Sequence, residues 1–107
     1  MTPTARSIKF LKDSGYRVAR VEHWLSFAKI RQDLFGVADL LGMKRDEPLV
    51  AVQVTTMSNL AKRQQKDPET VAVWLSTGNR FIYHGWSKKG PRGKRKTWQL
   101  VAREAQR

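Results

Sequence analysis

Two polar side chains stand inside otherwise apolar stretches of the sequence. Asp39 lies within GVADLLGM and Gln53 within LVAVQVTT. A carboxylate among apolar neighbours is costly to bury unless a hydrogen-bond donor, a cation or a metal ion partners it. Carboxylate and amide oxygens suit Mg²⁺, and Mg²⁺ at a phosphodiester can activate water. Two interpretations stay open: a metal site, or an Asp39 that pairs with an arginine or caps a loop while Gln53 bonds to backbone.

The segments that carry these two residues are expected to be neighbouring strands. Residues 34–43 and 48–56 are rich in apolar and β-branched residues, and the turn KRDEP joins them. A turn this short makes the strands antiparallel neighbours, which would bring Asp39 close to Gln53. The second strand is almost continuously apolar, as expected for a central strand covered on both faces.

The remaining patterns predict the elements around this pair. An amphipathic helix begins near Thr4 and ends before Gly15, and an alternating strand follows over residues 16–24. Helical segments are expected from residue 58 and, with an Asp67 cap and Pro68 at the first helical position, up to residue 77. Strands are expected over residues 80–86 and 97–102. The order α-β-β-β-α-β-β predicts an α/β (α+β) fold, a mixed central sheet flanked by helices in one domain of residues 1–107.

The charge of the chain indicates a polyanionic partner. It has 21 Lys and Arg against 9 Asp and Glu, a formal net charge of +12. Phosphate backbones are the commonest partners of such a field, and an anionic membrane surface or an acidic protein are the alternatives. A long apolar or amphipathic segment for membrane binding is missing. Cysteine is absent as well, which excludes disulfides and thiolate metal sites. With no secretory signal in MTPTARSIKF, we expect a cytoplasmic location.

A basic turn lies between the last two predicted strands. SKKGPRGKRK carries six cations and no acidic residue, namely Lys88, Lys89, Arg92, Lys94, Arg95 and Lys96. Such a hairpin tip can follow phosphates, and the alternative is a solvated loop. No aromatic residue inside it could stack on bases. Trp86 and Trp98 flank it and are interpreted as core or strand-pair residues rather than base stackers.

The segment GVADLLGMKRDEPLVAVQVTT resembles the core of the PD-(D/E)XK nuclease superfamily. Asp39 matches the aspartate of that motif, and Gln53-Val54-Thr55 lies where the (Glu/Gln)-x-Lys tripeptide belongs. Together with KFLKDSGYRVARV, the segment is similar to archaeal-type Holliday junction resolvases and small phage-encoded relatives, over roughly residues 5–86. The resemblance implies a restriction-endonuclease-like α-β-β-β-α-β core and an Mg²⁺- or Mn²⁺-dependent endonuclease that cuts DNA, with branched DNA as a candidate substrate. It also implies a homodimer, located in the host cytoplasm if phage-encoded.

The departures from the motif select further candidate residues. Thr55 stands where the family keeps a lysine, and Lys62 or Arg63 could replace that cation. Glu22 or Asp33 could complete a metal site with Asp39 and Gln53. The alternatives are that Glu22 pairs with Arg20 or Arg31, that Asp33 is a turn residue, and that both cations are solvated.

The candidate DNA contacts are basic residues of the first helix, the middle of the chain and the basic turn: Arg6, Lys9, Arg31, Lys62, Arg63, Lys88, Lys89, Arg92, Lys94, Arg95 and Lys96. Two rival functions remain. Thr55 favours a DNA-binding module that has kept the fold and lost the chemistry. Charge alone would also fit a small RNA-binding protein, which would not require Asp39 and Gln53 to converge.

Overall fold

The computed structural model describes residues 1–25 and 30–106, and for residues 24, 25 and 30–32 it describes the backbone alone. The elements are α1 (Pro3–Asp13), β1 (Arg17–Arg20), β2 (His23–Leu25), β3 (Ile30–Gln32), β4 (Leu40–Met43), β5 (Val50–Thr56), the 3₁₀ turn η1 (Met57–Asn59), α2 (Leu60–Gln64), α3 (Pro68–Ser76), β6 (Arg80–Lys89) and β7 (Thr97–Glu104). Within the described ranges, no helix combines the length and the apolar character that crossing a membrane would require.

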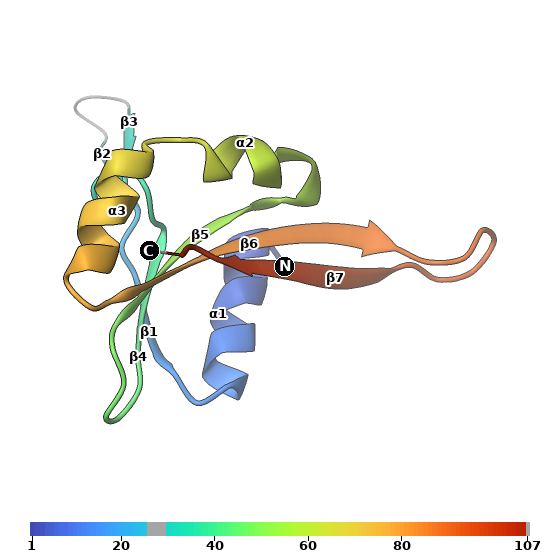
Figure 1. Ribbon diagram of the computed structural model, residues 1–107. Coiled ribbons are helices and arrows are strands. Elements are labelled where there is room, and N and C mark those ends of the chain that lie inside the picture. The colour runs from blue at the N-terminus through green and yellow to red at the C-terminus, as the bar shows by residue number, and fades with distance from the viewer. Residues whose placement is uncertain (26–29, 107) are drawn as a thin grey trace.

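A five-stranded mixed sheet of order β1-β4-β5-β6-β7 forms the centre of the fold (Figure 1). β5 and β6 are parallel, and the other neighbouring pairs are antiparallel. α1 covers one face, where Leu11 packs with Val50 and Val52, while Ala51 packs on the other face with Leu60 and other core residues. β5 is apolar along most of its length because helices cover both of its faces. The predicted mixed α/β fold is confirmed.

The boundaries differ from the sequence prediction in two places upstream of the site. The strand expected over residues 16–24 is divided into β1 and β2, and β2 pairs with β3 in a separate two-stranded sheet. The strand expected over residues 34–43 begins only at Leu40. A tight turn precedes it, because Phe35 and Gly36 both adopt positive φ angles and Leu34 pairs with Ala38. Asp39 therefore lies directly before β4, at the end of the sheet where β4 begins and β5 ends.

The two helical segments expected after residue 58 are both present, the first as η1 and α2 and the second as α3. Asp67, the N-cap of α3, adopts a left-handed conformation with φ of 47°. Its Oδ1 then accepts the backbone N–H of Thr70 at 3.2 Å, so the predicted cap and the predicted Pro68 start of a helix are both confirmed. The break between α2 and α3 leaves α2 short and places it beside the end of β5.

Ser7 joins α1 to the sheet through a buried polar contact. Its hydroxyl is fully buried, accepts the indole N–H of Trp86 at 2.8 Å and lies 2.8 Å from His84 Nδ1. Burial lowers the pKa of His84 to about 4, so the ring is neutral at pH 7. Phe10 packs edge-on against the same ring. These contacts hold α1 in one position along β6.

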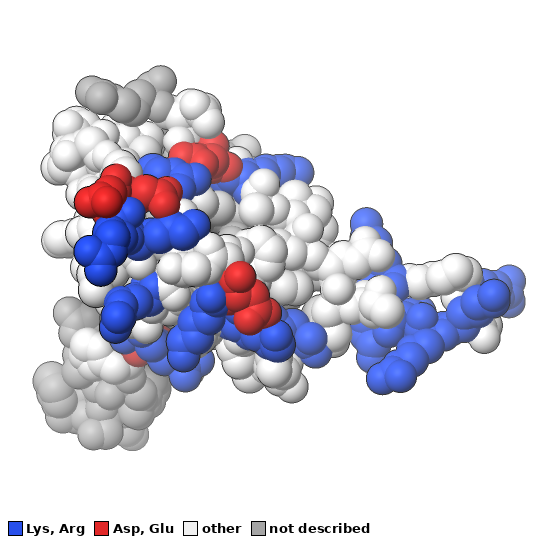
Figure 2. Space-filling view, turned by 90° about the horizontal axis from the view of Figure 1, so that it is seen from below, with Lys and Arg blue, Asp and Glu red and all other residues white. Residues whose placement is uncertain are grey.

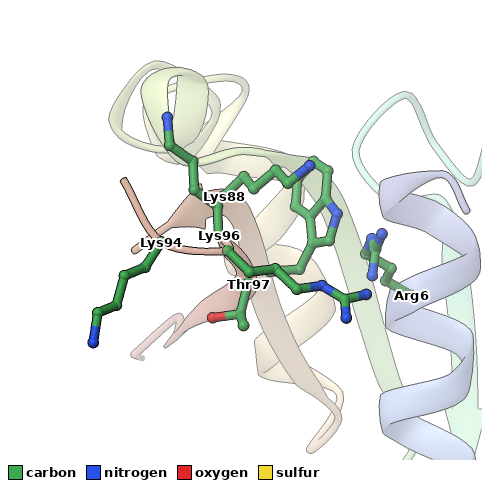
Figure 3. A pocket seen from close by; sticks show the side chains of 7 residues that line it. Arg6, Lys88, Lys94, Lys96 and Thr97 are labelled. Carbon is green, nitrogen blue, oxygen red and sulfur yellow. The ribbon is translucent and has the colours of Figure 1, made fainter. Parts of the chain in front are cut away.

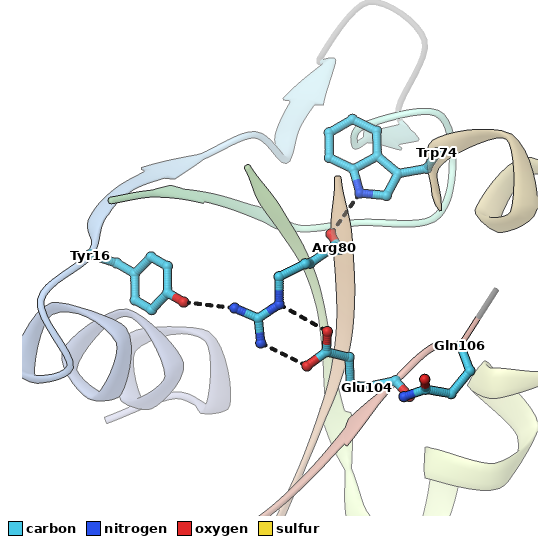
Figure 4. Close-up of polar contacts among 5 residues, drawn as sticks. All are labelled: Tyr16, Trp74, Arg80, Glu104 and Gln106. Atoms are coloured by element: carbon cyan, nitrogen blue, oxygen red, sulfur yellow. Dashed lines mark hydrogen bonds and ion pairs between the residues drawn. The ribbon is translucent and has the colours of Figure 1, made fainter. Parts of the chain in front are cut away.

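Arg80 fixes the other end of β6 (Figure 4). Its guanidinium donates two hydrogen bonds to Glu104 of β7, at 2.9 and 2.7 Å, and one to the Tyr16 hydroxyl at 3.0 Å. The pairing raises the pKa of Arg80 and lowers the pKa of Glu104. The Arg80 carbonyl accepts the indole N–H of Trp74 from α3 at 2.6 Å. Arg80 thus connects β6 to β7, to α3 and to the segment between α1 and β1.

We expect Ser7→Ala to destabilise the protein markedly. The change leaves the Trp86 N–H and His84 Nδ1 buried without their partner, at a cost of about 1–3 kcal/mol for each such group. Denaturant unfolding measures it. Ser14→Ala is the control, because that exposed hydroxyl bonds only to the Phe10 carbonyl, and its effect should stay within about 0.5 kcal/mol. Equal stability of the two variants would refute the structural role of Ser7.

Candidate functional site

A cavity of about 340 Å³ opens where β4 begins and β5 ends. Its lining residues come from six segments of the chain: Pro3, Thr4, Glu22, Asp33, Asp39, Gln53, Val54, Thr55, Thr56 and Arg63. The structure therefore brings together Glu22, Asp33, Asp39, Gln53 and Thr55, all of which the sequence predicts for one site. We call this space the carboxylate cavity.

Asp39 is positioned by backbone pairing on both sides. Its N–H donates to the Val52 carbonyl at 2.9 Å, and its own carbonyl accepts the Val21 N–H at 2.9 Å. The side chain then turns toward the end of β5. There Oδ2 accepts the Val54 N–H at 2.9 Å and the Gln53 amide Nε2 at 3.3 Å. Since Gln53 uses its NH₂ group for this contact, its amide oxygen is the atom it can offer to a cation.

The surroundings of Asp39, including two other carboxyl groups of the cavity, change its acidity. Burial raises the pKa of Asp39 to about 6, against the lowering effect of the Val54 hydrogen bond. The charge of Glu22, a hydrogen bond with the Glu22 side chain and the charge of Asp33 raise it further. Glu22 also lies 3.9 Å from Arg20 Nε, so the pairing considered as its alternative role is present as a long contact. Carboxyl groups crowded in this way favour a bound cation.

The donor set fits a hard divalent cation. Two or three carboxylates and an amide oxygen in a small open cavity suit Mg²⁺ or Mn²⁺, which bind through few protein ligands and keep several waters. Across residues 1–25 and 30–106, no three His, Cys, Asp or Glu side chains are already arranged as a metal-binding group. The residues that would hold such an ion are Asp39 and Gln53 with Glu22 or Asp33.

Arg63, rather than Lys62, lines the carboxylate cavity. Lys62 is exposed and faces a neighbouring cavity of about 540 Å³, which Asn59, Arg63, Gln65 and Lys66 also line. Of the two cations proposed to replace the missing lysine, Arg63 thus lines the carboxylate cavity and Lys62 lines only the neighbouring one. Arg63 belongs to both cavities and connects the acidic centre to the basic surface of α2.

A third cavity, of about 820 Å³, lies between α1 and the β6–β7 hairpin (Figure 3). Arg6 lines it from α1, and the hairpin contributes Lys88, Lys94, Arg95, Lys96, Thr97 and Trp98. We call it the hairpin cavity. Figure 2 shows cationic side chains gathered along the projecting hairpin, with no acidic side chain on it in that view.

The other predicted DNA contacts lie outside these cavities. Lys89 and Arg92 are exposed on the hairpin. Lys9 pairs with Asp13 at 2.7 Å on the surface of α1. The Arg31 side chain falls outside the described residues. Sequence reasoning did not select Thr4, because its place at the cavity follows from how α1 docks, which no local pattern reveals.

Comparison with protein-family models, curated proteins and solved structures gives no significant match for the chain.

Asp39→Asn should stabilise the protein at neutral pH. In the folded state the carboxyl has a pKa of about 6 rather than 3.8, so folding favours its protonated form, and stability is lost as pH rises between these values. Each pKa unit is worth about 1.4 kcal/mol, so we expect a gain of about 1–3 kcal/mol for the variant at pH 7.

Unfolding measured at several pH values checks this, and the gain should vanish near pH 4. His84 titrates in an overlapping range with the opposite slope, because its pKa is lowered rather than raised. The contribution of His84 to the pH dependence of stability is the same in the parent and the variant, so it cancels when their free energies of unfolding are subtracted. A variant less stable than the parent at pH 7 would contradict the crowded-carboxylate description.

Proposed function

We propose that the protein is a metal-dependent endonuclease that acts on DNA. The observation that carries the proposal is the convergence of Glu22, Asp33, Asp39 and Gln53 on one cavity, beside Arg63. The resemblance to the PD-(D/E)XK superfamily, and its resolvase-like members, favours DNA over RNA and suggests branched DNA and a homodimer. The flanking basic cavities support a phosphate-backbone partner.

Each residue of the site has a chemical part in phosphodiester hydrolysis. Asp39 would hold Mg²⁺ or Mn²⁺ with Gln53 and with Glu22 or Asp33, and the ion supplies Lewis-acid stabilisation and a more acidic water. The carboxylate that does not bind the ion can accept a proton from the attacking water. The water oxygen would bond to phosphorus as the bond to one bridging oxygen breaks, and the departing oxygen would take a proton from solvent water, which gives a phosphate end and a hydroxyl end.

Arg63 takes the electrostatic part that a lysine plays in the family motif. Its guanidinium can bind two non-bridging phosphate oxygens at once. Thr55 can hydrogen bond to water or phosphate, but a hydroxyl carries no charge to stabilise the developing anion. The positive charge of the cavity therefore comes from Arg63 on α2 instead of from a lysine on β5. Because the charge is not at the position that the family motif gives it, a DNA-binding module without cleavage is the second candidate function.

Asp39→Asn tests the proposed function directly. The variant should lose at least about 100-fold in cleavage rate, because it removes the central anionic ligand. Its affinity for the same DNA without metal should be kept or slightly increased, since a negative charge is lost. The assay is nicking of plasmid and branched oligonucleotide substrates in Mg²⁺ or Mn²⁺, with chelator as the blank.

Two results of that assay would overturn the proposal. Binding of DNA by the parent protein with no nicking in either metal would establish the binding module. Cleavage that survives Asp39→Asn would show that the reaction occurs elsewhere or is a contaminant.

Arg63→Ala should lower the cleavage rate by about 10- to 1,000-fold at saturating DNA, since it removes charge from the transition state. Arg45→Ala is the matched control. It deletes the same charge from the turn between β4 and β5, at the opposite end of those strands from the cavity, and should leave the saturated rate within about 2-fold. Equal losses in both variants would mean that Arg63 contributes only to overall charge.

A further inference from the structure

Arg6 and Trp98 form a stacked pair between α1 and the hairpin. The guanidinium carbon of Arg6 lies 4.3 Å from the centroid of the Trp98 ring. Trp98 pairs with Lys88 in the β6–β7 ladder, in agreement with the predicted strand-pair role, and its side chain remains 39% exposed. Trp86, for which the same role was suggested, is buried and bonded to Ser7. The hairpin thus presents one large aromatic side chain to solvent next to its basic turn.

Arg6 is incompletely satisfied in this position. Its Nε atom is buried and has no hydrogen-bond partner among the described residues. A buried donor without an acceptor is unusual in a folded protein. Trp98 holds the plane of the Arg6 guanidinium, and the Arg6 side chain lines the hairpin cavity, where an anionic ligand could contact it.

The rest of the hairpin cavity suits an anion that carries a planar ring. All of its charged lining residues are basic: Arg6, Lys88, Lys94, Arg95 and Lys96. Its volume of about 820 Å³ falls within the range of small-ligand sites, roughly 300–1,000 Å³. Cations alone are sufficient to hold a duplex backbone, so an exposed indole stacked with a guanidinium adds a function that duplex binding does not need.

We propose that the hairpin cavity binds an unpaired nucleotide, with its phosphate held by the lysines and arginines and its base stacked at the Arg6–Trp98 pair. Aromatic rings and guanidinium planes both stack on bases that are not paired in a duplex. This inference rests on the proposed function for the choice of DNA as the polymer.

The position of this cavity relates the unpaired nucleotide to the cut. Thr4 lines the carboxylate cavity and Arg6, two residues further along α1, lines the hairpin cavity. The same short stretch of helix therefore borders both sites. Because residues two apart point to different sides of a helix, α1 separates the two cavities, and we expect the preferred substrate to be DNA in which a single-stranded segment adjoins a duplex, so that each part occupies one cavity.

Binding measured in chelator, where no cleavage can occur, tests the inference separately from the proposed function. The probes are a duplex, a single strand and a forked duplex with one unpaired arm, compared by fluorescence anisotropy at fixed salt. We expect the fork and the single strand to bind more tightly than the duplex. Trp98→Ala should weaken these two by about 5- to 100-fold and the duplex by less than about 2-fold, while Trp98→Phe keeps most of the preference.

A 2-aminopurine placed in the unpaired arm gives a second readout. Its fluorescence should be quenched by stacking on the parent protein and on Trp98→Phe, and should recover in Trp98→Ala. Arg6→Ala should reduce the preference for the fork, whereas Lys12→Ala, the loss of a charge near the other end of α1, should not. Circular dichroism of each variant establishes that it is folded.

Three outcomes would overturn the inference: equal weakening of all three probes in Trp98→Ala, no preference of the parent protein for unpaired DNA, or binding of anionic lipid vesicles as tight as that of the fork. If the protein prefers the fork through Trp98 but never nicks DNA, the proposed cleavage is wrong and the nucleotide site is supported. If it cleaves DNA but shows no such preference, the nucleotide site is wrong and the proposed cleavage is supported.

Discussion

The carboxyl group of Asp39 is held where β4 begins and β5 ends, and the rest of the candidate site is arranged around it. Backbone bonds to Val52 and Val21 fix the chain on either side, and the Val54 N–H fixes the carboxylate itself. Because Val21 is bound to Asp39, the next residue, Glu22, is carried to the same place. The geometry that gathers the carboxyl groups also makes them repel one another. Folding energy from the surrounding sheet maintains this arrangement.

Acidic and basic groups are separated into adjoining compartments. The carboxylate cavity would repel a phosphate, whereas the cavities on α2 and the hairpin would attract one. A divalent cation among the carboxylates would make the electrostatic potential of that cavity positive. All three cavities would then attract phosphate. Metal and nucleic acid would then favour each other's binding. Arg63, which lines two of the compartments, lies at the boundary where this change of sign matters most.

Local patterns were sufficient for those parts of the fold that depend on neighbouring residues. The apolar run of β5, the Asp67-Pro68 helix start and the proximity of Asp39 to Gln53 all follow from short stretches of sequence. The turn before β4 was missed because Phe35 is an apolar residue in a left-handed conformation, which its type disfavours. The contacts of Ser7 with His84 and Trp86 span 77 and 79 residues, so no local pattern could reveal them. The exposure of Trp98 depends in the same way on how far the hairpin extends beyond the helices.

The buried anchor of α1 has a further consequence for how a bound strand would be measured. α1 cannot slide along the sheet without breaking the hydrogen bonds of Ser7, and the same helix borders both the carboxylate and the hairpin cavities. The spacing between the two cavities is therefore fixed by the fold. Under the proposed function, this fixed spacing would set the distance from the end of a duplex to the reacting phosphate, independently of the nucleotide sequence.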